Sequence, residues 1–320
     1  KMKNGKVVNL FAPSDMDKDF LSALGYGALM GILKNYEAVN PFISATTDSF
    51  NRLKPGFEAP VCVVTSLGLA PKIPSRNRTI LAGLIRDLDN PLATRIEMRS
   101  PNPYTNTYIA IAAFYLAALD GIKACVAGKY SLKQLEKEIS KKTGEKGFYL
   151  EQEREYRTEE DVFEAFTAEE RSHLFGEPPA TVWENMQGWK KFPEKKKVIM
   201  QGNIFNEKVL HSFGEGALIR WKTELINRLI PEVRCDVISA KKLHDEKNGT
   251  AFDDAAWEKV QEVREKLAKD AVRKPCIFTQ IQKGIETGDY AKASAKFLEM
   301  QELQLELHRL YHDYKQNIID

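Results

Sequence analysis

Segments with strand character are confined to the first two-fifths of this 320-residue chain. Short, β-branched apolar stretches occur at residues 61–66, 79–86 and 94–100, and residues 107–126 form a strongly apolar segment of helical length. Beyond Gly128 such stretches nearly vanish, and apolar residues recur at helical spacing instead. This pattern predicts an α+β fold, in which antiparallel strands packed on helices are followed by a mostly α-helical region.

Three parts follow from this change of pattern. Residues 1–127 form the mixed α/β part, residues 128–245 a helical part, and residues 246–320 a helical hairpin with Gly288 at its turn. A further strand is predicted at residues 7–11, and a first helix is predicted to begin at Ser14. Later helices are predicted at residues 133–142, 159–166, 180–189 and 207–229.

Composition excludes some classes of protein. The formal net charge is only +2, which argues against a nucleic-acid partner. The four cysteines are widely spaced, as expected for reduced thiols in a cytoplasmic protein. No segment is judged long enough to cross a bilayer, because the most apolar run ends at Asp120, so no membrane partner is expected.

Arginine is concentrated in residues 52–99, which contain six arginines and two lysines. A guanidinium can bind two oxygens of a carboxylate or phosphate at once, whereas an ammonium cannot. The bias therefore indicates a pocket for an anionic ligand.

The segment 94–99 adds a candidate metal ligand. On a strand, Ile96 and Met98 would face the core, while Arg95, Glu97 and Arg99 share the other face. A carboxylate between two cations can bind Mg²⁺ or Mn²⁺ beside anion-binding side chains. The alternative is a solvent-exposed strand whose charges only pair with one another.

The loop 52–60 presents two further charged groups. Pro55 and Gly56 favour a turn, and Pro60 ends the loop before the strand at 61–66. Arg52 and Glu58 are therefore expected on a shaped loop, where catalytic groups are often found.

These motifs together resemble those of glutamine synthetases. Residues 46–60 resemble the family's glutamate-flap segment, residues 75–79 its nucleotide-side Asn-Arg-Ser motif, and residues 95–103 with 106–108 and 119–122 the strand and helix that follow. All occur in the family's order and at near-family spacing. The resemblance implies that residues 1–127 are the C-terminal half of a glutamine synthetase catalytic domain, followed by the helical part of the catalytic region and a C-terminal extension typical of a larger bacterial type.

The resemblance implies a role for each charged residue on the glutamate side. Arg52 and Arg99 would bind the substrate glutamate. Glu58 would take a proton from ammonium and shield the reaction intermediate from water.

On the nucleotide side, the resemblance makes Arg78, Arg86 and Arg95 phosphate-binding residues and Glu97 a metal ligand. The separation of Arg86 from Arg78 is greater than in the common pattern. Leu92 lies where many members have a lysine that contacts the nucleotide.

The implied function is nitrogen metabolism by an ATP-dependent ligase. Glutamate, ammonium and ATP, with Mg²⁺ or Mn²⁺, would give glutamine through a γ-glutamyl phosphate in a ring-shaped homo-oligomer. The family's other metal ligands lie upstream of the segment that matches residues 3–11, so the chain is expected to be a C-terminal portion that is inactive alone. Two alternatives remain: a non-catalytic helical interaction or regulatory module, and a γ-glutamyl ligase for another amine.

Overall fold

The structure is a computed structural model that describes residues 2–3, 5–53, 60–245, 247 and 249–318. Two compact units divide the chain, Lys1–Glu215 and Gly216–Asp320, and the boundary falls within helix α9 (Glu207–Glu224). This boundary differs from the positions 127 and 245 expected from the sequence pattern. Residues 130–215 belong to the first unit because they pack on its strands and on its second helix.

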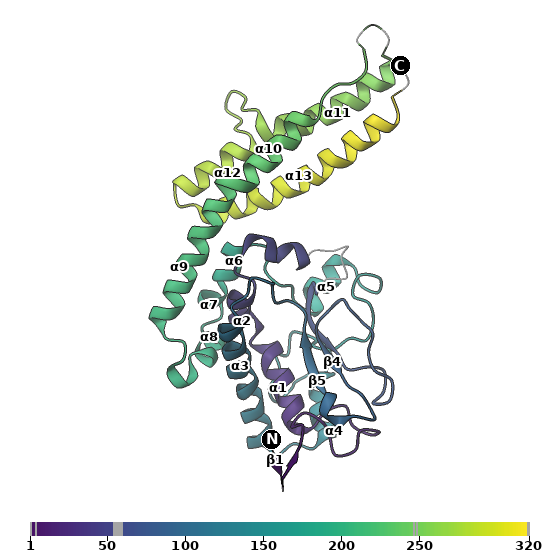
Figure 1. Ribbon diagram of the computed structural model, residues 1–320, viewed down its shortest axis with the longest axis vertical. Coiled ribbons are helices and arrows are strands. Elements are labelled where there is room, and N and C mark those ends of the chain that lie inside the picture. Colours follow the sequence, from purple (N-terminus) through teal and green to yellow (C-terminus); the bar gives the residue numbers. More distant parts are fainter. Residues whose placement is uncertain (1, 4, 54–59, 246, 248, 319–320) are drawn as a thin grey trace. The chain divides into compact units, whose positions relative to one another are not determined.

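The first unit is built on a three-stranded sheet (Figure 1) in the order β3 (Cys62–Ser66), β4 (Ile80–Ile85) and β5 (Arg95–Met98). The three predicted strands are confirmed, but the sheet is mixed and not antiparallel. β3 and β4 run parallel, and β4 and β5 run antiparallel with Gly83 opposite Glu97. A parallel pair needs a crossover, which residues 67–79 supply. Near the N-terminus, β1 (Met2–Lys3) pairs with β2 (Lys6–Val7), which is shorter than the strand predicted at 7–11.

Two predicted helix positions were wrong because polar side chains bond to nearby backbone instead. The first helix, α1 (Ala23–Lys34), begins nine residues after the predicted start because Ser22 caps it, accepting a bond from the Gly25 N–H. No helix forms at residues 159–166. There the carboxylate of Asp161 accepts bonds from the N–H groups of Phe163 and Glu164 and forms a turn.

Helix α3 (Thr107–Gly128) packs unusually closely on α1. A Cβ added at Gly31 would overlap the carbonyl oxygen of Ala117, and one added at Gly121 would overlap that of Gly27. Only residues without a side chain allow the two backbones to approach this far. The α1–α3 pair is therefore set by glycines on both helices.

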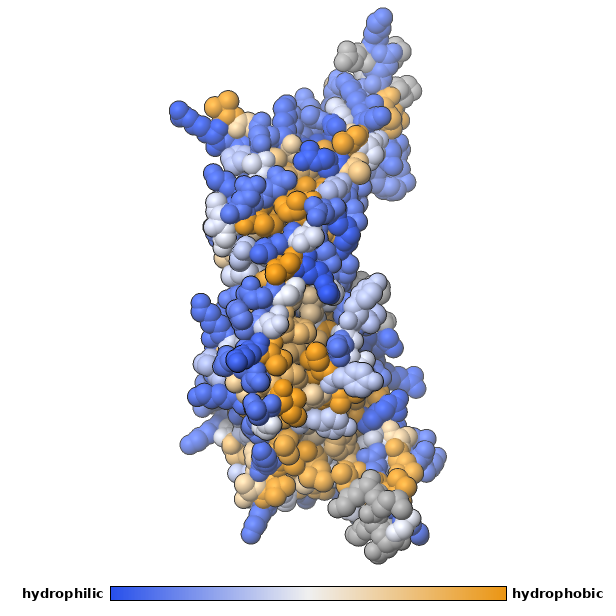
Figure 2. Space-filling view, turned by 60° about the vertical axis from the view of Figure 1, so that its left-hand side comes forward, coloured by the Kyte–Doolittle hydropathy of each residue, from blue (hydrophilic) through white to orange (hydrophobic). Residues whose placement is uncertain are grey.

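Helix α3 also corrects an expectation about membranes. It is long and apolar enough to span a bilayer by length and composition, although the sequence pattern suggested that no segment was. One face is buried, while Tyr108, Ile111 and Tyr115 are exposed on the other, and Figure 2 shows hydrophobic surface gathered on this unit. Core helices of soluble proteins share these properties, so this helix alone does not indicate a membrane protein.

Shorter helices complete the first unit. A 3₁₀ helix, η1 (Thr47–Leu53), follows α2 (Tyr36–Ile43). The helix predicted at 180–189 is present as two short helices, α6 (Val182–Met186) and α7 (Gly188–Lys191), and their bounds differ from the predicted ones. The remaining elements are η2 (Pro91–Ala93), α4 (Leu132–Ile139), α5 (Ala168–Leu174), α6 (Val182–Met186), α7 (Gly188–Lys191), α8 (Pro193–Ile199) and η3 (Gln201–Asn203).

A buried ion-pair network joins α2, α8 and the loop after α4. The Lys195 side chain is 2% exposed and lies 2.9 Å from a Glu37 oxygen and 2.7 Å from a Glu151 oxygen. Arg154 binds the other Glu37 oxygen at 2.6 Å. Burial raises the pKa of Glu151, but Lys195, Tyr156 and Arg154 outweigh burial and leave that pKa below its ordinary value.

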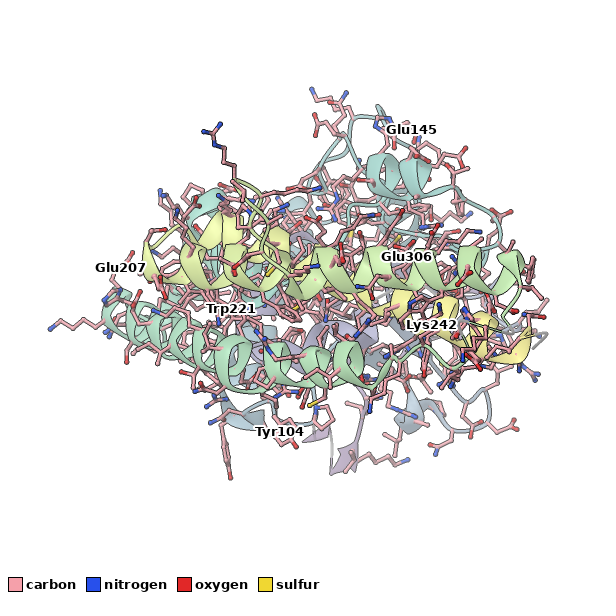
Figure 3. The ribbon with its side chains drawn as sticks, turned by 90° about the horizontal axis from the view of Figure 1, so that it is seen from above. Tyr104, Glu145, Glu207, Trp221, Lys242 and Glu306 are labelled. Atoms are coloured by element: carbon pink, nitrogen blue, oxygen red, sulfur yellow. The ribbon has the colours of Figure 1, made fainter. Side chains whose placement is uncertain are left out.

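The second unit consists of helices (Figure 3). After α9, a π-helical turn (Leu225–Leu229) precedes α10 (Ile230–Ser239), where Pro231 lacks the N–H of a regular helix. Gly288 lies at a turn, as predicted, with a φ of +76°, and this turn joins α12 (Ile277–Glu286) to α13 (Tyr290–Gln316). The helix α12 was not anticipated. The remaining helices are α11 (Ala251–Ala268), α12 (Ile277–Glu286) and α13 (Tyr290–Gln316).

Replacing Gly31 by Ala should destabilise the first unit by about 1–3 kcal/mol, because the added methyl group must push α3 away. Gly214→Ala in α9 is the matched control. Its new methyl would make an ordinary 3.6 Å contact with Trp189 and should stabilise the helix by roughly 0.5–1 kcal/mol. Urea unfolding monitored by tryptophan fluorescence measures both, and equal midpoints would contradict the close packing.

Replacing Lys195 by Met should cost about 3–5 kcal/mol at neutral pH, because it removes a buried cation that Glu37 and Glu151 share and leaves Arg154 to neutralise both partly buried carboxylates. The Glu151 pKa is lowered in the folded state, so its contribution is present above the ordinary value of 4.5 and is lost as pH falls through the folded value. The difference between wild type and variant should therefore shrink as the pH falls below 4.5 and through the lowered pKa of Glu151. Unfolding curves between pH 3 and 8 measure it, and a pH-independent difference would contradict the charge argument.

Candidate functional site

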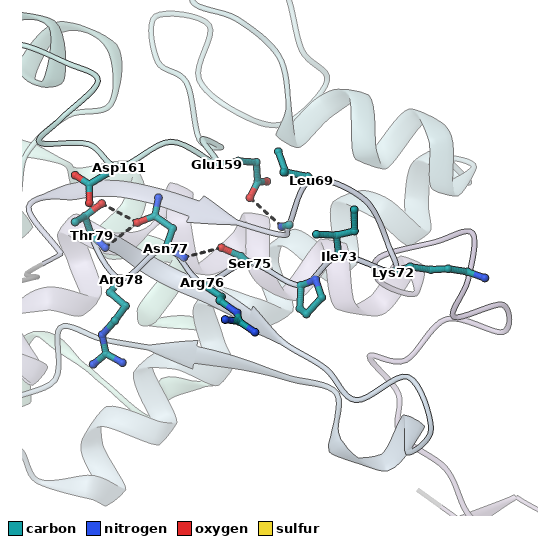
Figure 4. Close-up of a pocket in the computed structure, with 12 residues that line it drawn as sticks. Leu69, Lys72, Ile73, Ser75, Arg76, Asn77, Arg78, Thr79, Glu159 and Asp161 are labelled. Atoms are coloured by element: carbon teal, nitrogen blue, oxygen red, sulfur yellow. Dashed lines mark hydrogen bonds between the residues drawn. The ribbon is translucent and has the colours of Figure 1, made fainter.

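The crossover between β3 and β4 forms one wall of a cavity of about 670 Å³ (Figure 4). This volume lies in the range of about 300–1,000 Å³ typical of small-molecule sites. Backbone and side chains of the crossover meet the segment 159–161, which is far away in sequence. The lining residues are Gly68, Leu69, Lys72, Ile73, Pro74, Ser75, Arg76, Asn77, Arg78, Thr79, Glu159 and Asp161.

Arginine and polar side chains alternate along the last part of the crossover. Figure 4 shows Arg76 and Arg78 projecting to the side of this segment opposite Asn77 and Thr79, and both arginines are exposed. The Asn77 side chain is fixed, since its oxygen accepts from the N–H and hydroxyl of Thr79 and its amide donates to the Glu160 carbonyl at 2.6 Å. Because Asn77 is fixed, the backbone on either side of it is fixed too, and Arg76 and Arg78 project in a set direction. Two guanidinium groups held in this way can bind an anion.

Glu159 was missed by sequence reasoning. Its carboxylate accepts hydrogen bonds from the Ser66 hydroxyl, the N–H groups of Leu67 and Gly68, and the Arg157 guanidinium. Burial raises the Glu159 pKa, but these bonds outweigh burial and leave it below the ordinary value. The alternation of Arg157 and Glu159 around Thr158 is typical of a strand and could have indicated that this segment lies beside β3. The pattern from residue 159 onward instead predicts a helix.

The predicted alternation along β5 is confirmed. Arg95 and Glu97 are exposed, whereas Ile96 and Met98 between them are partly buried. Because paired residues of an antiparallel ladder share a face, Glu97 lies beside Gly83 of β4, which contributes no side chain. The face around Glu97 is therefore open.

Arg52 is brought to the same end of β5 as Arg99. It lies in η1, and its guanidinium donates to the Pro101 carbonyl at 3.0 Å, two residues beyond Arg99. The two predicted glutamate-binding arginines are thus close in the fold although far apart in sequence. Glu58, the predicted catalytic carboxylate, lies outside the described residues.

Arg86 differs from its predicted role in phosphate binding. It is buried, and its guanidinium donates to the backbone carbonyls of Met16, Asp19 and Phe20 at 2.6–3.2 Å. Burial lowers its pKa. These bonds favour a structural role, in which Arg86 holds the turn before α1.

The described residues fit a nucleotide better than a divalent ion. The cavity has the volume and the exposed guanidinium groups that a polyphosphate ligand needs. Among the described residues, no group of three or more histidine, cysteine, aspartate or glutamate side chains is placed to bind a metal. Glu97 could supply one ligand, so a complete metal site would need further groups.

Fold and pocket together define an α+β domain with a cavity at a strand crossover that is lined in part by Lys72, Arg76 and Arg78. The sequence model of the family "Glutamine synthetase, catalytic domain" matches residues 2–172, more than half of the chain. The chain therefore belongs to the glutamine synthetase family.

Curated relatives support the same assignment. The chain is 40% identical over 124 residues to the glutamine synthetase of Aquifex aeolicus, and 40% identical over 121 residues to that of Escherichia coli K12. It is 41% identical over 121 residues to that of Methylococcus capsulatus. In each case the match covers 38% of this chain and 23% of the relative, so the chain spans about a quarter of the length of these relatives.

Replacing Arg86 by Ala should lower the stability of the first unit by about 2–3 kcal/mol, because three buried or partly buried carbonyls lose a charged donor. Arg76→Ala, which removes an exposed guanidinium, should change stability by no more than about 0.5 kcal/mol. Urea unfolding of both variants measures the difference. Equal stability of the two would contradict the structural role of Arg86.

Proposed function

We propose that this chain is the C-terminal portion of a glutamine synthetase, which joins ammonia to the side-chain carboxylate of L-glutamate at the expense of ATP. The main supporting observation is geometrical. The crossover that lines the cavity leads directly into β4, and β4 pairs with β5, whose exposed face presents Arg95 and Glu97. A nucleotide in the cavity would thus lie on the same sheet as the proposed glutamate-binding groups.

ATP is the proposed ligand of the cavity. Arg76 and Arg78 would bind phosphate oxygens, since both are exposed and project from a segment fixed by Asn77. Arg95, on the neighbouring strand, would bind the polyphosphate end, as the family resemblance implies. These guanidinium groups would stabilise the charge that develops on the transferred phosphoryl group.

Glutamate is the proposed substrate at the other end of β5. Arg52 and Arg99 would bind its carboxylate groups from two sides, because Arg52 already reaches the chain just beyond Arg99. Glu58 would accept a proton from ammonium. The glutamate side-chain carboxylate would attack the terminal phosphorus of ATP and release ADP, and ammonia would then displace phosphate from the γ-glutamyl phosphate.

We further propose that the chain does not make glutamine by itself. A divalent ion would neutralise phosphate charge in the complete enzyme, but among the described residues Glu97 is not part of a group of three or more side chains that could hold a metal. Other metal ligands would come from outside this segment. Assembly into a homo-oligomeric ring and a cytoplasmic location remain proposals based on the family.

A non-catalytic module is the second candidate. The openness of the face around Glu97 and the size of the helical second unit favour it. A module of this kind would bind partners without needing nucleotide. A related ligase acting on another amine would retain nucleotide and glutamate binding, so substrate tests of the full-length enzyme distinguish it.

Isothermal titration calorimetry of the chain with ATP tests the nucleotide site. Wild type should bind, and Arg78→Ala should weaken binding about 10-fold or more, the effect of losing one charged hydrogen bond of about 1.5–3 kcal/mol. Arg309→Ala removes an exposed arginine of α13 and is the matched control. Absence of binding by wild type would favour the non-catalytic module.

A coupled assay with glutamate, ammonium, ATP and Mg²⁺ tests the second part of the proposal. The purified chain should form no glutamine, because its described residues hold no group of three or more metal-binding side chains. Metal- and ATP-dependent glutamine formation by the chain alone would show that its own residues complete the site.

A further inference from the structure

The crossover at residues 67–79 contains no helix or strand, yet it lines most of the cavity. Its shape therefore depends on hydrogen bonds with other segments, in addition to those within the crossover. A segment at 156–158 runs beside β3, where the Thr65 N–H donates to the Tyr156 carbonyl and the Thr158 N–H donates to the Thr65 carbonyl. Glu159 follows this segment at the point where β3 ends and the crossover begins.

A carboxylate has about four acceptor positions, two on each oxygen. In Glu159 all four are used. One oxygen accepts from the Leu67 N–H at 3.1 Å and from the Arg157 Nε at 2.8 Å. The other accepts from the Gly68 N–H at 2.9 Å and from the Ser66 hydroxyl. No acceptor position remains for a ligand.

We infer that Glu159 is a positioning residue for the nucleotide cavity: it fixes the crossover and, through it, the arginine edge, without binding the nucleotide. This inference rests on the proposed function, because it assumes that the cavity binds ATP. The contacts of Glu159 themselves do not depend on that assumption.

Two serine hydroxyl groups connect Glu159 by hydrogen bonds to the last part of the crossover. The Ser66 hydroxyl, which donates to Glu159, is also hydrogen-bonded to the Ser75 hydroxyl. Ser75 in turn accepts from the Asn77 N–H at 3.1 Å. Because Asn77 lies between Arg76 and Arg78, this chain of bonds connects the Glu159 carboxylate with the two guanidinium groups.

The turn at Gly68 requires the same support. Gly68 has a φ of +107°, and a Cβ there would overlap the Ile73 carbonyl oxygen. Its N–H donates to Glu159, and its carbonyl accepts from Arg157 at 2.9 Å. Arg157 is itself held by the Ser140 hydroxyl and by the Phe20 ring, so the turn is fixed to a rigid base.

Glu159→Gln tests the inference, because an amide group replaces one acceptor oxygen. Two of the four donors then lose their partner, and one of these two is a backbone N–H of the crossover, that of Leu67 or Gly68. ATP binding by calorimetry should weaken about 10-fold. In the nucleotide-free protein, hydrogen exchange of residues 66–79 should become at least about 10-fold faster. Glu160→Gln is the control, because Glu160 contributes only its main chain to these contacts.

A pH titration gives a readout that general loss of stability would not produce. In wild type, the amide NMR signals of Leu67 and Gly68 should titrate together with a midpoint below 4.5, because the Glu159 pKa is lowered. In Glu159→Gln this joint titration should vanish. If Glu159→Gln does not fold, Ser75→Ala should still speed exchange at Asn77 and weaken ATP binding, without touching the carboxylate.

The outcomes separate the two proposals. If wild type binds no ATP, the proposed function fails, whereas the exchange data still test the role of Glu159 in the free protein. If wild type binds ATP while Glu159→Gln matches Glu160→Gln in both binding and exchange, the inference is overturned.

Discussion

The parallel pairing of β3 with β4 is the constraint on which the candidate site depends. Two parallel strands cannot be joined by a tight turn, so the chain must leave the sheet between Ser66 and Ile80 and return to the same end. That excursion forms the wall of the cavity. Because it has no regular secondary structure, its backbone groups need partners from elsewhere, and Glu159 with Arg157 supplies them.

The rest of the first unit gives this arrangement a rigid support. Glycines allow α1 and α3 to approach closely, and a buried network around Lys195 joins α2 to α8. Arg86 belongs to the same framework, since it binds the backbone just before α1. Charged residues therefore differ in their surroundings: the buried ones hold elements together, and Arg76, Arg78, Arg95 and Glu97, at the cavity and on β5, are exposed to solvent.

Much of the fold was accessible from the sequence. The strands at 62–66, 80–85 and 95–98 and the helix α3 have strong apolar patterns, and the alternation around Glu97 was correctly predicted. The start of α1 and the segment after Glu159 were not, because Ser22 and Asp161 bond to local backbone in ways that apolar periodicity does not reveal. The parallel direction of β3 was missed because strand patterns do not encode direction.

The sequence by itself determined the kind of chemistry, because a cluster of arginines with one carboxylate on a strand suits anionic ligands whatever the surrounding fold. It also determined the family, through motifs whose residues lie close together in the chain. Only the tertiary structure decided which charges are available. Arg86 binds backbone carbonyls and Glu159 binds the backbone of the cavity wall. These backbone groups are more than sixty residues away in sequence, so the sequence around Arg86 or Glu159 does not identify them.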